Sequence, residues 1–242
     1  MRFVLASGNR NKLREFRAIL AAHEVVPMPA GIVLPPESVT SFRDNALGKA
    51  RALAAALSAD GAAFAAVAGR PDGAPTATRG ATHPAQQLLC LADDSGLEVE
   101  ALGWAPGVIS SRYAGEDATD GDNNAKLLAE LEGCPLDRRH ARFVCVAAVV
   151  VASVAVTRGR LAEYVASGEW WGTITAAPHG DAGFGYDPVF LLDGSDLTVA
   201  ELPQEVKDQA SHRALAGRAL LELLEREGVL DGATHGGRSP TD

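Results

Sequence analysis

The sequence is poor in cysteine, and this scarcity bears on both fold type and compartment. Only Cys90, Cys134 and Cys145 occur among 242 residues, and no two of them form a CxxC pair. An odd number of dispersed cysteines argues against a disulfide framework or a structural zinc site. Free thiols are typical of reducing compartments, so the cytoplasm is the predicted location.

Positive charge is also scarce. Lys and Arg number 22 against 31 Asp and Glu, which gives a formal net charge of −9. Nucleic-acid backbones are held by Lys and Arg, so no nucleic-acid partner is predicted. A small anionic ligand remains compatible with this composition, because a local basic cluster or a bound cation can reverse the field.

Long hydrophobic runs are missing as well. The longest, Phe143 to Val156, is shorter than the ~20 residues that a membrane helix needs, and its many valines predict a long buried strand instead. The N-terminus, MRFVLASGNRNK, becomes polar after a few apolar residues, so it does not read as a signal peptide. No membrane partner is therefore predicted.

The residues that are present predict an α/β fold. Hydrophobic residues make up 47% of the chain, enough for a substantial core in one large domain or two intimate lobes. Arg2 to Ala6 form a predicted strand, followed by a polar turn and a helix at about Asn11 to Ala22, which is the opening of an α/β protein. Further helices are predicted at about Asp44–Leu57, Asn123–Glu132 and Ser211–Glu227, and further strands at Leu88–Ala92, Phe143–Val156, Leu161–Ala166 and near Trp171–Thr175.

Two segments are predicted to lie outside this folded core. Residues 59–87 are rich in Ala, Gly, Pro and Thr and poor in large apolar side chains, which predicts a flexible insertion. The Gly-rich residues 229–242 predict a disordered tail. The folded domain is therefore expected to span residues 1–228.

The first candidate binding segment is the turn from Ser7 to Lys12. Free N–H groups at a helix N-terminus bind anions, and Lys12 adds a positive charge. Ser7 and Asn9 add polar side chains. The segment is no Walker loop, since GxxxxGK[ST] is absent. From this segment alone, an ordinary strand–helix turn with a surface lysine is the favoured interpretation.

The second candidate is Asp93-Asp94-Ser95-Gly96, which follows the apolar stretch Leu88–Ala92. Ligands of open α/β sheets bind at the carboxyl ends of strands. Neighbouring strand residues point to opposite faces, so one of the two carboxylates is expected in the site. Such oxygen ligands suit Mg²⁺. The alternative is a turn in which Asp caps backbone N–H groups.

Other segments carry weaker signals. Glu37 lies in the loop before the second helix, and Lys49 falls within that helix; singly, each reads as solvated surface. Gly183 to Pro188 combines glycines, aromatic rings and one acid, which suits a ring-binding loop or a packed hairpin turn. Positive side chains at His212 and Arg213 would oppose the dipole of a helix that begins at Ser211, which indicates a ligand requirement or a solvated helix start.

Together these segments resemble the inosine triphosphate pyrophosphatase family. The matching stretches appear in family order: LASGNRNKLREF, PESVTSFRDNALGKARA, LADDSGLEVEALGWAPGVISSRYAGEDATD, GFGYDPVF and KDQASHRALAGRAL. The combination of ADDSG, FGYDP and SHR is specific, and the resemblance spans most of the chain. Arg112 and Tyr113 lie within a matching stretch, but the sequence assigns them neither to site nor to scaffold.

The resemblance implies a two-lobed α/β fold around a long twisted mixed sheet, a cleft between the lobes and a homodimer. It implies hydrolysis of ITP, dITP and XTP to the monophosphate and pyrophosphate, with Mg²⁺, or Mn²⁺ in its place. Asp94 is the implied proton acceptor for water, and Glu37 and Asp94 are the implied metal ligands. The implied substrate-binding residues are Ser7, Gly8, Asn9, Arg10, Asn11, Lys12, Lys49, Ser95, Phe184, Gly185, Tyr186, Asp187, Lys207, His212 and Arg213.

Three other functions stay open at this point. A related fold could act on modified pyrimidine nucleotides, and a nucleotide-binding regulator could use the same residues without catalysis. An aspartyl-phosphate phosphatase would use Asp93 or Asp94 as nucleophile, but that chemistry expects a DxD pair, and here the two acids are adjacent. The residues at the start of the last helix also predict selectivity for the base. Donors at His212 and Arg213 would favour a 6-keto purine over adenine, whose 6-amino group would leave them unpaired.

Overall fold

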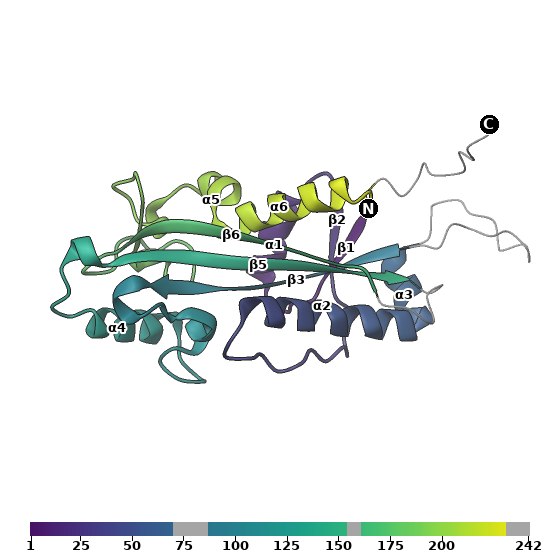
Figure 1. Ribbon diagram of the computed structural model, residues 1–242, viewed down its shortest axis with the longest axis horizontal. Helices are drawn as coiled ribbons and strands as arrows, with labels where there is room; N and C mark the ends of the chain where they lie inside the picture. The colour runs from purple at the N-terminus through teal and green to yellow at the C-terminus, as the bar shows by residue number, and fades with distance from the viewer. Residues whose placement is uncertain (70–86, 154–160, 231–242) are drawn as a thin grey trace, which may run out of the picture.

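The computed structural model describes residues 1–69, 87–153 and 161–230 and shows one mixed sheet with helices on both faces (Figure 1). Across the sheet the strands follow the order β2, β1, β3, β5, β6, β7, and β4 pairs with the end of β3. Neighbours are parallel from β2 to β3 and antiparallel from β3 onward. The strands span β1 Arg2–Leu5, β2 Glu24–Pro27, β3 Gln87–Val99, β4 Ala105–Pro106, β5 His140–Ser153, β6 Glu163–Ile174 and β7 Phe190–Leu192.

The helices begin at polar caps that the sequence supplies. Asn9, Ser41, Thr119 and Ser211 accept hydrogen bonds from the first-turn N–H groups of α1, α2, α4 and α6. The α-helices span α1 Arg10–Ile19, α2 Phe42–Ala59, α3 Gly61–Ala68, α4 Asp120–Glu130, α5 Gln204–Ala210 and α6 His212–Arg226. Short 3₁₀ helices include η2 Gly107–Arg112 and η4 Asp187–Val189.

Alternate residues of the long strands pack into two separate cores. One core lies between the sheet and α2 and α3, where Leu53 and Leu57 meet Cys90. The other lies between the sheet and α1 and α6, where Phe16 meets Leu89. Figure 1 shows α2 below the sheet and α6 above it. Because side chains alternate along a strand, consecutive residues of β3 enter different cores.

The far end of the sheet carries a third core, which forms the second lobe. Leu97, Leu127, Trp170 and Phe190 are buried there, together with Tyr113. The predicted α/β class, mixed sheet and two-lobed layout are thus confirmed.

The strand predictions were wrong at two places. The predicted strand Leu88–Ala92 was expected to end at the two aspartates, but β3 continues to Val99 and pairs with β5 along its whole length. The predicted strands 161–166 and 171–175 are one strand, β6. In both cases cross-strand pairing outweighs the local turn-like composition.

The predicted flexible insertion at residues 59–87 begins with ordered structure. Residues 61–68 form α3, and Phe64 is buried in the core beneath α2, so the expected lack of order is wrong for this part. Residues 70–86 lie outside the described residues. At the other end of the chain, Val229 and Leu230 pack against the α1–α6 core, while 231–242 lie outside the described residues.

Within the described ranges, no single helix is long and apolar enough to span a membrane. Only α2 and α3 taken together reach the required length and composition, and they are bent by 107° relative to each other. Both contribute residues to the core against the sheet.

One edge of β3 is left open by its neighbours. The pairing of β1 with β3 ends at Leu5 and Leu91, and β4 joins β3 only at Glu98. Between these points, residues 92–97 have no strand beside them on that edge in the described part of the chain. The carboxyl end of β1 meets this gap, which is where α/β sheets bind ligands.

The first turn of α6 lies very close to the sheet. Gly168 of β6 faces this turn, and a Cβ atom at this position would overlap the backbone of His212 and Ala216. The missing side chain therefore lets α6 settle directly on β6, and from there Arg213 reaches Asp93 and Ser95 of β3.

Candidate active site

A cavity of about 420 Å³ opens at the free edge of β3. Its walls come from the end of β1 and start of α1, the loop before α2, β3 itself, η2 and the start of α6. The predicted site residues that line it are Ser7, Gly8, Asn9, Lys12, Glu37, Lys49, Asp94, Ser95, Phe184, Gly185, Tyr186, Asp187, His212 and Arg213. Segments far apart in the chain thus meet in one cleft.

Three predicted residues do not line this cavity. Arg10 and Asn11 belong to the first turn of α1 and do not contribute to the wall. Lys207, on α5, is buried and its Nζ lies 2.6 Å from Asp187 Oδ2. It therefore reaches the cleft only through Asp187.

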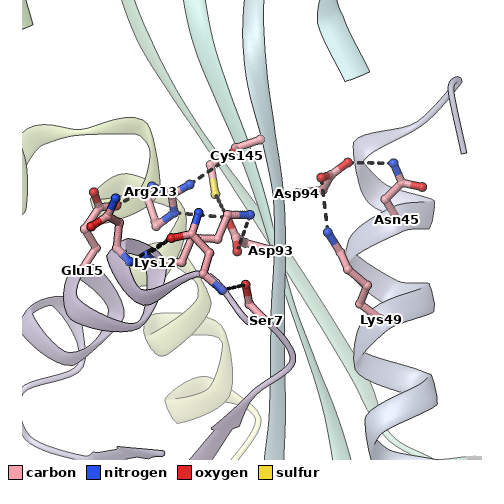
Figure 2. A network of polar contacts seen from close by, with 12 residues as sticks. Ser7, Lys12, Glu15, Asn45, Lys49, Asp93, Asp94, Cys145 and Arg213 are labelled. Atoms are coloured by element: carbon pink, nitrogen blue, oxygen red, sulfur yellow. Dashed lines mark hydrogen bonds and ion pairs between the residues drawn. The ribbon is translucent and has the colours of Figure 1, made fainter. Parts of the chain in front are cut away.

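Asp93 and Asp94 point to opposite faces of the sheet, as the alternation of a strand requires (Figure 2). Asp93 faces α1 and α6. Its Oδ1 lies 3.0 Å from Lys12 Nζ, and its Oδ2 accepts from Arg213 Nε at 3.1 Å. Asp93 is therefore a buried anion between two cations.

Asp94 faces α2 across the other side of β3 (Figure 2). Its Oδ2 accepts from Asn45 Nδ2 at 2.8 Å, and its Oδ1 lies 3.3 Å from Lys49 Nζ. The same ammonium lies 3.0 Å from Glu37 Oε1. Lys49 thus joins two carboxylates that come from distant segments.

The two aspartates differ in electrostatics. Burial would raise the pKa of Asp93, but Lys12 and Arg213 overcome it and hold that pKa well below its usual value. Burial raises the pKa of Asp94 and outweighs the opposing effects of Lys49 and Asn45. A raised pKa makes a carboxylate a stronger base, so Asp94 suits proton transfer and Asp93 does not.

The turn before α1 is braced by its own side chains. Ser7 Oγ accepts from the N–H of Asn9 at 3.1 Å, and Asn9 Oδ1 accepts from the N–H groups of Asn11 and Lys12. Lys12 extends from this turn to Asp93, so it is the cation that this segment brings to the cleft.

The loop from Gly183 to Asp187 closes the cleft on the side of the second lobe. Gly183 has φ +89°, and a Cβ there would overlap Asp187, so both backbone and space require glycine. Asp187 Oδ2 accepts from the N–H of Phe184 at 3.2 Å. Burial raises the pKa of Asp187 and outweighs Lys207.

At the start of α6, His212 and Arg213 have different characters. Burial and the nearby Arg213 lower the pKa of His212 well below its usual value, so this ring is neutral. The expectation of a positive His212 is therefore wrong. The ring stacks on Phe143, with centroids 4.9 Å apart and planes 16° apart.

Arg213 is 2% exposed and is held on three sides by the protein. Besides Asp93, its guanidinium contacts Glu15 on α1, and its Nη2 donates to Ser95 Oγ at 2.9 Å. The sequence did not point to Glu15, because its partner lies 198 residues away.

Several other residues in or next to the cleft carried no recognisable signal in the sequence. Asp120 Oδ2 accepts from the N–H of Gly185 at 2.7 Å, and Asn124 Nδ2 donates to the carbonyl of the same glycine at 3.0 Å. Ser110 Oγ accepts from the N–H of Leu97 at 2.8 Å and closes the open edge of β3. Only their position one turn apart on α4 could have linked Asp120 and Asn124.

The two residues that the sequence left unassigned play different parts. Arg112 Nη1 lies 3.5 Å from Glu37 Oε2, on the side of that carboxylate away from Lys49. Tyr113 is buried in the core of the second lobe and its hydroxyl donates to Glu130. Arg112 therefore borders the site, and Tyr113 belongs to the scaffold.

The carboxylates of this cleft fit a hard divalent cation. Glu37 and Asp94 present one oxygen each to a common point, now marked by the ammonium of Lys49. Lys49 and Arg112 lower the pKa of Glu37 although burial opposes them, so this carboxylate is ionised. The described residues hold no cluster of three or more His, Cys, Asp or Glu side chains, so water and phosphate oxygens would complete the shell of a Mg²⁺ ion.

A mixed α/β sheet and a cleft that combines lysines with two convergent carboxylates define an α/β protein whose site suits an anionic ligand together with a divalent cation. The chain belongs to the Ham1 family, whose model matches residues 3–223.

Curated relatives and solved structures agree with this assignment. A dITP/XTP pyrophosphatase of Nocardia farcinica is 42% identical, with 92% of this chain and 93% of the relative covered. One of Methylococcus capsulatus is also 42% identical, with 92% and 96% covered. The structure of the Staphylococcus aureus Ham1 protein matches with a TM-score of 0.69 at 33% identity, over 94% of this chain and all of that chain.

Proposed function

We propose that this protein hydrolyses non-standard purine nucleoside triphosphates, ITP, dITP and XTP, to the monophosphate and pyrophosphate. Relatives at about 40% identity over nearly the whole chain are named dITP/XTP pyrophosphatases. The observation that carries the chemistry is the pair Asp93 and Asp94, whose pKa values move in opposite directions within one cleft. Environments that push two carboxylates apart mark the acid–base assignment of a site.

Asp94 is the proposed general base. Its Oδ2 is held by Asn45, which leaves the side chain fixed while Oδ1 faces Lys49. In this position Asp94 would orient a water molecule and take its proton as the water attacks the α-phosphate. Asp93 already pairs with Lys12 and Arg213, so its proposed role is to position these two cations.

Lys12 and Lys49 approach the cleft from opposite faces of β3, and both would hold triphosphate oxygens. Glu37 and Asp94 would hold Mg²⁺. When bound, this ion neutralises phosphate charge and stabilises the leaving pyrophosphate.

The base is proposed to lie between the loop 183–187 and the start of α6. Phe184 supplies a ring for stacking. Tyr186 is 4% exposed, packs in the core of the second lobe and donates its hydroxyl to the carbonyl of Ser110, so its proposed role is to hold this wall of the cleft.

Hydrogen-bond donors come from neutral His212 and from Arg213. The guanidinium of Arg213 keeps N–H groups beyond those that contact Glu15, Asp93 and Ser95. Donors suit the 6-keto oxygen of hypoxanthine and xanthine, whereas the 6-amino group of adenine would leave them unpaired.

A pyrophosphate-release assay on ITP, XTP, dITP, ATP and dCTP, with and without Mg²⁺, tests the proposal. We expect metal-dependent release of pyrophosphate from the first three and at least ~10²-fold lower kcat/KM for ATP. Equal kcat/KM for ATP and ITP would refute it, and preference for dCTP would favour the pyrimidine alternative. Tight binding without turnover would identify a regulator.

The proposal also includes a homodimer in the cytoplasm that acts without a nucleic-acid or membrane partner. Light scattering coupled to gel filtration measures the mass of the particle. A monomer at working concentration would contradict this part and leave the chemistry untouched.

A further inference from the structure

Lys49 lies where the two proposed metal ligands converge. Its Nζ is 3.0 Å from Glu37 Oε1 and 3.3 Å from Asp94 Oδ1. A Mg²⁺ ion lies about 2.1 Å from its oxygen ligands. An ion bound to both oxygens would therefore occupy space next to or within that filled by the ammonium, and the two cations would repel each other.

The carboxylates of this cluster already have cations beside them in the free protein. Glu37 and Asp94 contribute two negative charges, and Lys49 supplies one positive charge between them. Arg112 lies 3.5 Å from the second oxygen of Glu37 and shares its charge with the exposed Glu116. A divalent cation that enters this cluster without a nucleotide would be repelled by the cations that already lie beside the two carboxylates.

Lys49 lines the cleft but is largely shielded from water. Its side chain is 10% exposed, because α2 packs this position against the sheet. A largely buried ammonium that loses its anions is destabilised. Lys49 therefore leaves the carboxylates most readily when another anion reaches it, and the triphosphate is the anion that this cleft is proposed to bind.

We propose that Lys49 is a resident cation of the metal site, which fills the space between Glu37 and Asp94 until a triphosphate gives its ammonium a replacement anion. The site then binds a divalent cation weakly by itself and well together with the triphosphate. This inference rests on the proposed function, and it adds a binding order and a second role for Lys49.

Lys12 offers a matched control on the opposite face of the same strand. It is also a lysine with a largely buried side chain, at 17% exposure, and its ammonium lies 3.0 Å from Asp93, which is not a proposed metal ligand (Figure 2). Removal of either lysine deletes one positive charge from the cleft. Only removal of Lys49 vacates the point between Glu37 and Asp94.

The test measures Mn²⁺ binding to the full chain without nucleotide, by calorimetry or by the paramagnetic resonance signal of free Mn²⁺. We expect Lys49→Met to lower the Kd for Mn²⁺ at least about tenfold, and Lys12→Met to change it by less than about threefold. Adding Glu37→Gln to Lys49→Met should abolish the gain. An unchanged Kd in Lys49→Met, or equal tightening in both lysine variants, would overturn the inference.

Melting temperatures provide a readout that does not depend on activity. Mn²⁺ should raise the melting temperature of Lys49→Met more than that of the wild-type protein. Lys49→Gln, which keeps a polar side chain, repeats the comparison if Lys49→Met does not fold. Pyrophosphate release from ITP by the wild-type protein tests the proposed function separately, so either idea can fail while the other stands.

Discussion

The two faces of β3 use the same residue type, one peptide apart, for different ends. On one face Asp93 is buried and pairs with a lysine of α1 and an arginine of α6, which lower its pKa. On the other face Asp94 shares a single lysine with Glu37, and its pKa is raised. The first carboxylate is a permanent anion that orders its neighbours, and the second can take up a proton.

The comparison shows that proximity in sequence does not set the chemistry of a carboxylate. Each aspartate belongs to a different face, so each meets its own helices and its own cations. A strand that passes through a cleft can therefore give one side chain to the scaffold and the next to catalysis, with no loop between them.

The largest expected effect comes from removing the base. Asp94→Asn should lower kcat for ITP about 10²–10⁴-fold, because an amide cannot accept the proton of water. The melting temperature should fall little, because burial penalises the ionised form of Asp94 and Lys49 keeps Glu37 as a partner. Steady-state kinetics and a circular-dichroism melt measure both. Near-normal turnover by the folded variant would remove Asp94 from the mechanism.

Asp93, on the opposite face of β3, is expected to matter more for stability than for turnover. Asp93→Asn leaves Arg213 and Lys12 with an uncompensated positive charge, and breaking such a buried pair costs about 3–5 kcal/mol. The free energy of unfolding should fall by that order, measured by urea denaturation. Loss of kcat in the folded fraction should be smaller than for Asp94→Asn.

The pH dependence of that stability loss gives a further check. Because the folded pKa of Asp93 lies below its unfolded value of about 3.9, its stabilisation is complete above the unfolded pKa and is lost as pH falls toward the folded one. The difference between wild type and Asp93→Asn should therefore be largest at neutral pH and shrink in acid. A difference that grows in acid would contradict the ion-pair role.

A smaller effect is expected at Asn45, which donates to Asp94 and also exchanges two hydrogen bonds with the backbone of Ser38. Asn45→Leu removes a donor to the ionised carboxylate, so the pKa of Asp94 should rise further. Activity needs the deprotonated base, so the acid limb of the kcat profile should move to higher pH. An acid limb that stays in place would show that Asp94 does not control it.

The smallest effect is expected at Cys145, on the side of Asp93. Its Sγ lies 3.9 Å from Asp93 Oδ2, and burial raises the pKa of the thiol to about 12, so it is neutral. Cys145→Ala should cost about 1 kcal/mol of stability and change kcat less than about twofold. A larger loss of kcat would show that the thiol helps to place the cations around Asp93.

Local signals in the sequence predicted α1, α2, α4 and α6, but not α3 or α5. Ser211 was expected at the start of α6 and caps it, because capping depends on residues that are close in the chain. The alternation of strand residues also correctly separated Asp93 from Asp94. These features follow from backbone periodicity alone.

Contacts between distant segments could not be predicted in this way. The two aspartates and the glycine after Ala92 were predicted to end a strand. In the structure β3 continues to Val99, because it pairs with β5 along this stretch and the two carboxylates meet lysines on both faces. Asn45 and Glu15 touch their partners across 49 and 198 residues. The fold class and most cleft residues came from motifs, whereas the roles of Asp93 and Lys49 needed three-dimensional contacts.

Gly168 shows that a residue outside the cleft can determine where the residues of its wall lie. The residue is outside the cavity, yet the spacing between α6 and β6 depends on the absence of its side chain. An alanine there would lift the first turn of α6 off the sheet and carry His212 and Arg213 with it. A variant at this position would therefore behave in a kinetic assay like an active-site mutant, although none of its atoms could ever reach a nucleotide.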